Sequence, residues 1–236
     1  MELRCKNLKK IGKILFVILI FAACAWWGRI GKDVFLNAET NQAALILDAG
    51  HGGEDGGAVS LSGAKESDIN LSVVLRMEQL LGFLGECPTL LRQEDISLHD
   101  DSAVTLREKK ISDLKNRTQT ANANSNATLV SIHQNTYPEQ QYRGAQVFYA
   151  PTEGSRELAK VVQQSLTEYI QPENTRQEKQ ISDSVYLMNH IENRAILVEC
   201  GFLSHPEEEQ LLRQDDYQRK LAMVLAFKLF EVVRQK

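Results

Sequence analysis

Short apolar runs alternate with longer segments of helical periodicity from about residue 44 to the end of the chain. The runs AALILD, ATLVSIH and AILVE are apolar almost to their last residues, a pattern typical of strands buried on both faces of a sheet. Between the first two runs, Ile69, Val73 and Met77 recur at helical spacing, and Ser67 is a candidate N-cap. The alternation indicates the α/β class.

The remaining segments fit the same plan. CPTLLR and AQVFYA are further candidate strands, and helices are expected over 103–125, over SRELAKVVQQSLTEYI and from about Asp215 onward. Strands and helices in this order predict a single α/β domain over residues 44–236, with a mainly parallel, twisted sheet and helices on both faces. Ligands of such sheets bind at the carboxyl ends of the strands, so we expect the functional site there.

Residues 1–30 differ from the rest of the chain. Basic residues precede the uncharged stretch ILFVILIFAACAWW, which is the layout of an export signal or a membrane anchor. Three interpretations stay open: cleavage after Ala25 in an A-x-A pattern, lipidation of Cys24 in a poor lipobox, and an uncleaved anchor. Each places the domain outside the cytoplasm, either secreted or held at the membrane through the N-terminal segment, with residues 31–43 as a linker.

The charge and the cysteine content argue against a nucleic-acid-binding protein and against a disulfide scaffold. The formal net charge is −4, and the first 13 residues carry about +4, which leaves about −8 for the remainder. An acidic exported domain is a poor nucleic-acid binder. Beyond the N-terminal segment only Cys87 and Cys200 remain, too few for a disulfide scaffold, so we expect buried free thiols.

Four residues with metal-binding or acid–base chemistry fall at the ends of predicted elements. His51 follows the first strand in LDAGHGGEDGGA, and His133 closes LVSIH. Glu66 lies at a helix start, and Glu199 closes AILVE, where an unpaired carboxylate would be costly to bury. Singly, each has an ordinary structural explanation, such as a turn residue, a core histidine or an ion pair. Together, two histidines and one carboxylate form a catalytic zinc set or a non-haem Fe(II) set, and the second carboxylate suits a proton acceptor.

The glycines around His51 do not indicate phosphate binding. A dinucleotide-binding turn opens a helix, and a P-loop requires G-K-[ST], whereas GHGGEDGG runs into the polar AVSLSGAKESD without a lysine in place. We expect these glycines to let the backbone turn sharply and approach a substrate closely.

The motifs LDAGHGGEDGGA, GAKESDIN, LVSIHQN and LVECGFLSHPEEEQLL resemble, in order and spacing, those of the zinc-dependent N-acetylmuramoyl-L-alanine amidases of the amidase-3 type. The resemblance implies that His51, Glu66 and His133 bind Zn²⁺ and that Glu199 is the catalytic base. It further implies that the substrate is peptidoglycan. The expected reaction is hydrolysis of the amide between the lactyl group of N-acetylmuramic acid and L-alanine of the stem peptide.

The short single domain, with REKKISDLKNR, RGAQVFYA and VYLMNH, is more similar to the sporulation branch, the spore-cortex or germination-specific amidases. That resemblance implies a step toward muramic-δ-lactam in the forespore intermembrane or cortex space, with a muramic-acid deacetylase acting downstream. The sequence leaves open whether an activating or stabilising protein partner is needed.

Three further residues are candidate contacts for the peptide carboxylates or the glycan, namely Arg92, Asn135 and Arg143. Three other functions compete with the amidase. A zinc carboxypeptidase acting on the stem peptide would need a cationic clamp for a terminal carboxylate. A zinc-containing wall-binding or scaffold protein would be expected to lack Glu199. An Fe(II) oxygenase fits neither the element order nor the export segment.

Overall fold

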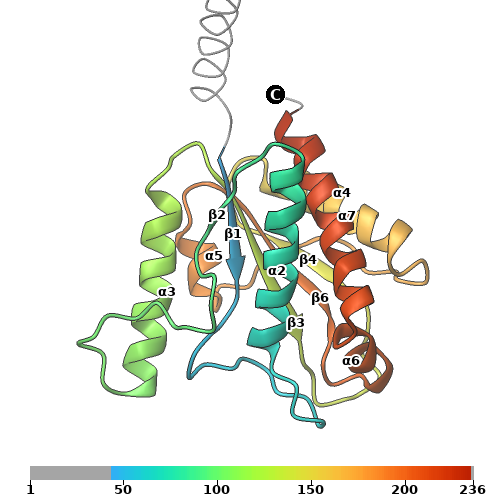
Figure 1. Ribbon diagram of the computed structural model, residues 1–236, viewed down its shortest axis with the longest axis horizontal. Coiled ribbons are helices and arrows are strands. Elements are labelled where there is room, and N and C mark those ends of the chain that lie inside the picture. The colour runs from blue at the N-terminus through green and yellow to red at the C-terminus, as the bar shows by residue number, and fades with distance from the viewer. Residues whose placement is uncertain (1–43, 235–236) are drawn as a thin grey trace, which may run out of the picture. The chain divides into compact units, whose positions relative to one another are not determined.

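The computed structural model describes residues 44–234, so the predicted signal or anchor (1–30) and linker (31–43) lie outside the described residues. It contains one six-stranded sheet (Figure 1). The strands are β1 (Leu45–Ala49), β2 (Thr89–Leu90), β3 (Thr128–Asn135), β4 (Gln146–Tyr149), β5 (Lys179–Gln180) and β6 (Arg194–Phe202). Within this part of the chain, no helix has the length and apolarity needed to cross a membrane.

The strand order is β2-β1-β3-β6-β4-β5, and the first four strands run parallel. β4 runs antiparallel to β6, and β5 runs parallel to β4. The mainly parallel prediction is therefore confirmed, with two strands at one edge reversed. Residues 136–145, which join β3 to β4, contain no helix that could return the chain to the other end of the sheet, so β4 begins at the end where β3 finishes.

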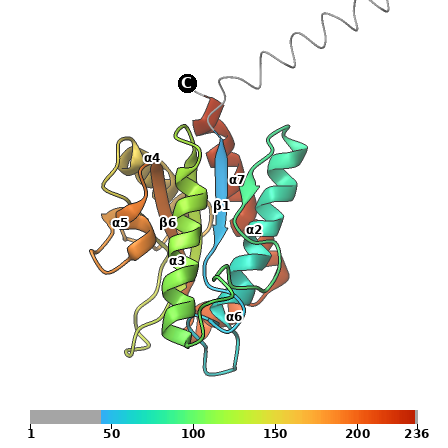
Figure 2. The same cartoon turned by 90° about the vertical axis from the view of Figure 1, so that its left-hand side faces the viewer.

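Helices cover both faces of the sheet, as predicted. On one face α2 (Glu66–Phe83), α4 (Ser155–Tyr169) and α7 (Asp215–Arg234) enclose the larger apolar core. On the other face α3 (Leu106–Asn122) and α5 (Tyr186–His190) enclose a smaller one. Figures 1 and 2 both show α3 and α2 on opposite sides of β1. A short helix, α6 (Pro206–Leu212), connects β6 to α7.

Each strand residue faces one of these two cores according to the two-residue period of a strand. In β3, Val130 and Ile132 belong to the larger core, whereas Leu129 belongs to the smaller one. The same alternation sends His133 toward the face of the sheet that carries α3 and α5. The loops that follow β1, β3 and β6 leave the sheet at one end, and this end carries the site.

Three sequence-based expectations need correction. Helix α2 begins at Glu66 with Lys65 at its N-cap position, so Ser67 is not the cap; its side chain is buried inside the first turn. The predicted CPTLLR strand shortens to two residues, Thr89–Leu90. Cys87 and Cys200, the cysteines within the described residues, are free, as expected, but Cys87 is exposed and only Cys200 is buried.

Candidate metal centre

His51, Glu66 and His133 meet at the end of the sheet where β1 and β3 finish. His51 lies just after β1, Glu66 is the first residue of α2, and His133 lies near the end of β3. One ligand atom from each residue lies within 4.8 Å of the others. The structure therefore brings together three side chains that are separated by up to 82 positions in the sequence.

The Glu66 carboxylate lies between the two imidazoles. Its Oε1 atom is 3.3 Å from Nε2 of His51 and 2.8 Å from Nδ1 of His133. The backbone N–H of Ala58 donates to Oε2 at 2.8 Å, and that of Gln134 donates to Oε1 at 3.1 Å. Burial opposes ionisation of Glu66, but the hydrogen bonds from His133 and His51 outweigh it and hold the pKa of the carboxyl well below its usual range.

Asp55 fixes the orientation of the His51 ring. The Nδ1 atom of His51 lies 3.0 Å from Oδ2 of Asp55, which leaves Nε2 pointing at Glu66. Burial acts to lower the pKa of His51, but the hydrogen bonds to Asp55 and Glu66 raise it to about 9. A carboxylate behind a histidine ring is the usual second partner of a metal-binding imidazole, since it fixes the tautomer and increases the basicity of the ligand nitrogen.

The glycine-rich loop permits this convergence at two positions. A Cβ atom on Gly50 would lie 2.2 Å from the His133 ring. Gly57 has a φ of +67°, and a Cβ atom there would lie 2.5 Å from Oε2 of Glu66. Glycine is needed at both positions because a side chain there would displace a member of the cluster; the expected close approach to a substrate stays a prediction.

A buried ion pair holds the backbone of the same loop. Arg117 of α3 pairs with Asp48 of β1, and both side chains are almost fully buried. The guanidinium also donates to the carbonyl of Ala49 at 3.0 Å and to that of His51 at 2.7 Å. Burial acts to raise the pKa of Asp48, but Arg117 and the hydroxyl of Ser131 keep it lowered.

Arg92, a candidate substrate contact in the sequence, also binds the backbone of this region. Its side chain is only 2% exposed, and its guanidinium donates to the carbonyls of Ala49, Gly50, Ser67 and Glu94 at 2.8 to 3.1 Å. Four of the five N–H donors of this guanidinium are thus used on backbone carbonyls, and the side chain is enclosed, so the structure gives Arg92 a role in holding the backbone. Arg92 and Arg117 together hold three consecutive carbonyls, those of residues 49–51.

Glu199 lies on β6 directly across from His133 in the register of the two parallel strands. The next residue, Cys200, packs in the larger core, so Glu199 points to the opposite face, which also carries His133. Its Oε2 atom is buried and has no hydrogen-bond partner among the described residues. Burial raises the pKa of Glu199 to about 7. A carboxyl group with that pKa exchanges protons near neutral pH.

The two other candidate substrate residues are not part of the group formed by His51, Glu66 and His133. The side chain of Asn135 turns back to accept a hydrogen bond from the backbone N–H of Thr136 at 2.8 Å. Arg143 is exposed and lines a separate cavity of about 600 Å³ with Arg176 and His205. The structure does not bring either residue into the His–Glu–His cluster.

Sequence reasoning missed Asp48, Asp55 and Arg117. Asp48 ends an apolar strand as Glu199 does, and the same cost of burying a charge could have pointed to a partner. Asp55 follows His51 by four residues within one glycine-rich turn. Arg117 lies in a segment so rich in charge that it is indistinguishable from a solvated helix face, and only the fold shows that it is buried.

The donor set fits a divalent metal ion. Two imidazole nitrogens and one carboxylate oxygen converge, each ring nitrogen lies near the same oxygen, and no fourth His, Cys, Asp or Glu joins this group among the described residues. Three such ligands with one open position are the composition of catalytic metal sites. With the carboxyl group of Glu199 opposite His133 on the neighbouring strand, this arrangement on an α/β sheet is that of a metal-dependent hydrolase.

Comparison with known protein families shows to which family of hydrolases the chain belongs. Residues 45–227 match the Amidase_3 family, described as N-acetylmuramoyl-L-alanine amidase. The chain belongs to this family and is an N-acetylmuramoyl-L-alanine amidase, an enzyme of cell-wall peptidoglycan, which implies a place outside the cytoplasm.

Individual relatives cover almost all of the domain. The germination-specific N-acetylmuramoyl-L-alanine amidase of Bacillus subtilis (strain 168) is 35% identical over 221 residues, which span 92% of this chain and 91% of that protein. The CwlD amidase of Clostridioides difficile, solved in complex with the GerS lipoprotein, matches with a TM-score of 0.78 and 35% identity over 83% of this chain and 100% of its own. An N-acetylmuramoyl-L-alanine amidase of Clostridium difficile 630 matches with a TM-score of 0.71 and 28% identity over 84% of this chain and 100% of its own.

Proposed function

We propose that this amidase hydrolyses the bond between the lactyl group of N-acetylmuramic acid and L-alanine, with Zn²⁺ held by His51, Glu66 and His133. The observation that carries the proposal is the convergence of these three donors within 4.8 Å beside Glu199. When bound, zinc supplies a Lewis acid that polarises the scissile carbonyl and makes water a better nucleophile near neutral pH. Nitrogen and oxygen donors with an open position favour zinc for this chemistry.

Glu199 acts as the proton carrier of this mechanism. Its carboxylate accepts a proton from the attacking water and transfers it to the nitrogen of the departing L-alanine. A pKa raised by burial to about 7 suits both roles, because the group accepts and releases a proton with little cost near neutral pH. Its Oε2 atom has no partner among the described residues, which leaves that oxygen available for the transfer.

The cellular role that we propose is removal of stem peptides in the spore cortex, in the space between the forespore membranes. Support comes from the name of the Bacillus subtilis relative, a germination-specific amidase. A muramic-acid deacetylase would act on the product to form muramic-δ-lactam. An activating or stabilising partner is part of the proposal, since the similar Clostridioides difficile amidase was solved with a lipoprotein. The N-terminal segment would hold the enzyme at the membrane or direct its secretion.

Digestion of purified peptidoglycan sacculi by the chain tests the proposal. The protein is stripped of metal with a chelator and assayed with and without added Zn²⁺, and the released ends are determined by mass spectrometry. We expect free lactyl carboxyl groups and new L-alanine amino termini in equal amounts, only when zinc is present. Cleavage between amino acids of the stem peptide would instead establish a carboxypeptidase or endopeptidase. A folded, zinc-loaded protein that cleaves nothing, with or without a candidate partner, would contradict the proposal.

A further inference from the structure

Two neighbouring cavities on the α3 side of the metal centre share part of their lining, and we refer to the two together as the groove. The first, of about 150 Å³, lies between the loop that carries His51, the segment Ser97–His99 and α3. The second, of about 70 Å³, lies between α3 and the segment that precedes α5, and His133 contributes to its lining. Both are lined by His51, Asp55, Lys110 and Asp113, so the groove runs past the metal ligands.

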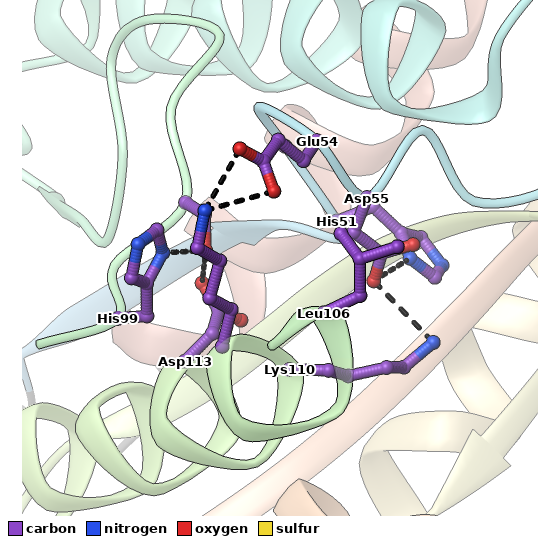
Figure 3. Close-up of a pocket in the computed structure, with 10 residues that line it drawn as sticks. His51, Glu54, Asp55, His99, Leu106, Lys110 and Asp113 are labelled. Atoms are coloured by element: carbon purple, nitrogen blue, oxygen red, sulfur yellow. Dashed lines mark hydrogen bonds and ion pairs between the residues drawn. The ribbon is translucent and has the colours of Figure 1, made fainter. Parts of the chain in front are cut away.

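Most charged groups in this groove already have protein partners. Lys109 donates to both carboxylate oxygens of Glu54, at 2.8 and 3.0 Å. Asp113 accepts from Arg117 at 2.7 Å and from the backbone N–H of Leu98 at 2.6 Å. Asp55 accepts from His51 (Figure 3). These groups hold the walls of the groove, and their hydrogen-bonding capacity is largely used.

Lys110 differs from these groups. Within residues 44–234 its Nζ atom makes one ion pair, 3.4 Å from Oδ2 of Asp55, and the side chain is 56% exposed, compared with 23% for Lys109. Figure 3 shows the ammonium group reaching from α3 toward the aspartate beside His51. An ammonium group has three donors, so two remain for a ligand in the groove. Opposite this side of α3, Val185 and Leu187 give the groove an apolar wall.

We propose that Lys110 is a specificity residue that binds a carboxylate of the stem peptide on the leaving-group side of the scissile amide. This proposal rests on the proposed amidase function. In peptidoglycan the residue after L-alanine is a D-glutamate joined through its γ-carboxyl, which leaves its α-carboxylate free close to the scissile bond. The groove would thus take the acidic start of the peptide, with Lys110 pairing that carboxylate and the partly buried Val185 contacting the aliphatic part.

The test uses two muropeptides that differ only in this group, one with the free α-carboxylate and one with its amide. We expect the wild-type enzyme to prefer the carboxylate form in kcat/KM by about tenfold, the size of a hydrogen bond to a charged group. Lys110→Met should lower kcat/KM for the carboxylate form about tenfold and leave the amide form nearly unchanged. Lys110→Arg should restore much of the preference, and Lys110→Glu should reverse it.

Two controls separate specificity from disturbance of the metal centre. Lys115→Met changes an exposed lysine further along α3 and should leave both rates unchanged. The zinc content of each variant is measured, because loss of the Lys110–Asp55 contact could act through His51; such an effect would lower both rates equally. Equal wild-type rates for the two muropeptides, or equal losses in Lys110→Met, would overturn this proposal and leave the amidase function standing. Failure of the wild type on both substrates would overturn the proposed function itself.

Discussion

Gly57 and Gly63 have the same kind of left-handed backbone, with φ of +67° and +87°, but different surroundings. A Cβ atom on Gly57 would press on Glu66 and His51, whereas one on Gly63 would meet nothing within 4 Å. We expect Gly57→Ala to lower zinc affinity at least about tenfold. Gly63→Ala should cost about 1 kcal/mol of stability from backbone strain and leave zinc binding intact. Competition with a chromogenic chelator measures the first effect and urea unfolding the second. Equal zinc affinities in the two variants would contradict the account of the loop.

Arg117 links the core to the metal loop through its pair with Asp48 and its bond to the carbonyl of His51. We expect Arg117→Met to lower the free energy of unfolding by about 3–5 kcal/mol, because it leaves a carboxylate buried without its charged partner. Urea denaturation measures the loss. Arg107→Met, at an exposed position of the same helix, is the control and should change stability by less than about 0.5 kcal/mol. A small loss in Arg117→Met would show that Asp48 is solvated or protonated instead.

Cys87 and Cys200, the cysteines in the part of the chain that the structure describes, should differ in reactivity. Burial raises the pKa of the Cys200 thiol to about 12, and the residue is fully enclosed in the core, whereas Cys87 is exposed. Only the thiolate is alkylated at an appreciable rate. Iodoacetamide at pH 8 should therefore modify Cys87 in the native protein and reach Cys200 only after unfolding, as read by mass spectrometry. Rapid native labelling of Cys200 would contradict its placement.

Functional residues can be predicted from the sequence where a side chain with metal-binding chemistry also lies at the end of a predicted element. His51, Glu66 and His133 stand out because each carries metal-binding chemistry at the end of a predicted element. Residues that act through hydrogen bonds to the backbone, such as Arg92 and Arg117, have no sequence pattern that reveals this role. Arg92 illustrates the difficulty, since its type and place suggested a substrate contact, while only the fold shows it enclosed among carbonyls.

Some helices and strands can be predicted from the sequence, and others cannot. The strands that become β1, β3 and β6 were predicted because long apolar runs can only be buried on both faces. The sequence does not predict β5, α5 and α6, which have two, five and seven residues, because segments this short show no hydrophobic period. The reversed direction of β4 depends on the connection from β3 and not on its own residues.

A capping box stabilises the start of α3. The Thr105 side chain accepts from the backbone N–H of Glu108, and the Glu108 carboxylate accepts in return from that of Thr105, which completes a capping box. We expect Thr105→Ala to lower the unfolding free energy by about 1 kcal/mol. Thr120→Ala, an exposed change within the same helix, should be neutral or slightly stabilising, because alanine is the better helix former. Equal losses in the two variants would mean that the cap contributes nothing.

In the whole molecule, the strand order places the ends of β1, β3 and β6 side by side, so that ligands distant in sequence share one point. The larger core of α2, α4 and α7 supports this edge from one face. Glu199 and His133 face the other, where α3 and α5 border the groove. Composition could indicate an acidic extracytoplasmic domain, but the position of the groove depends on which helix packs on which face.

We propose that His51, Glu66 and His133 hold the metal and that Glu199 carries the proton. The most direct test of these roles measures the zinc content and the amidase rate together in the variants Glu199→Gln and His133→Ala. We expect Glu199→Gln to keep about one zinc per chain and lose at least about 100-fold in kcat, since general acid–base catalysis contributes at least that much. His133→Ala should lose both zinc and activity. Loss of zinc from Glu199→Gln, or retention of its activity, would contradict the division of roles.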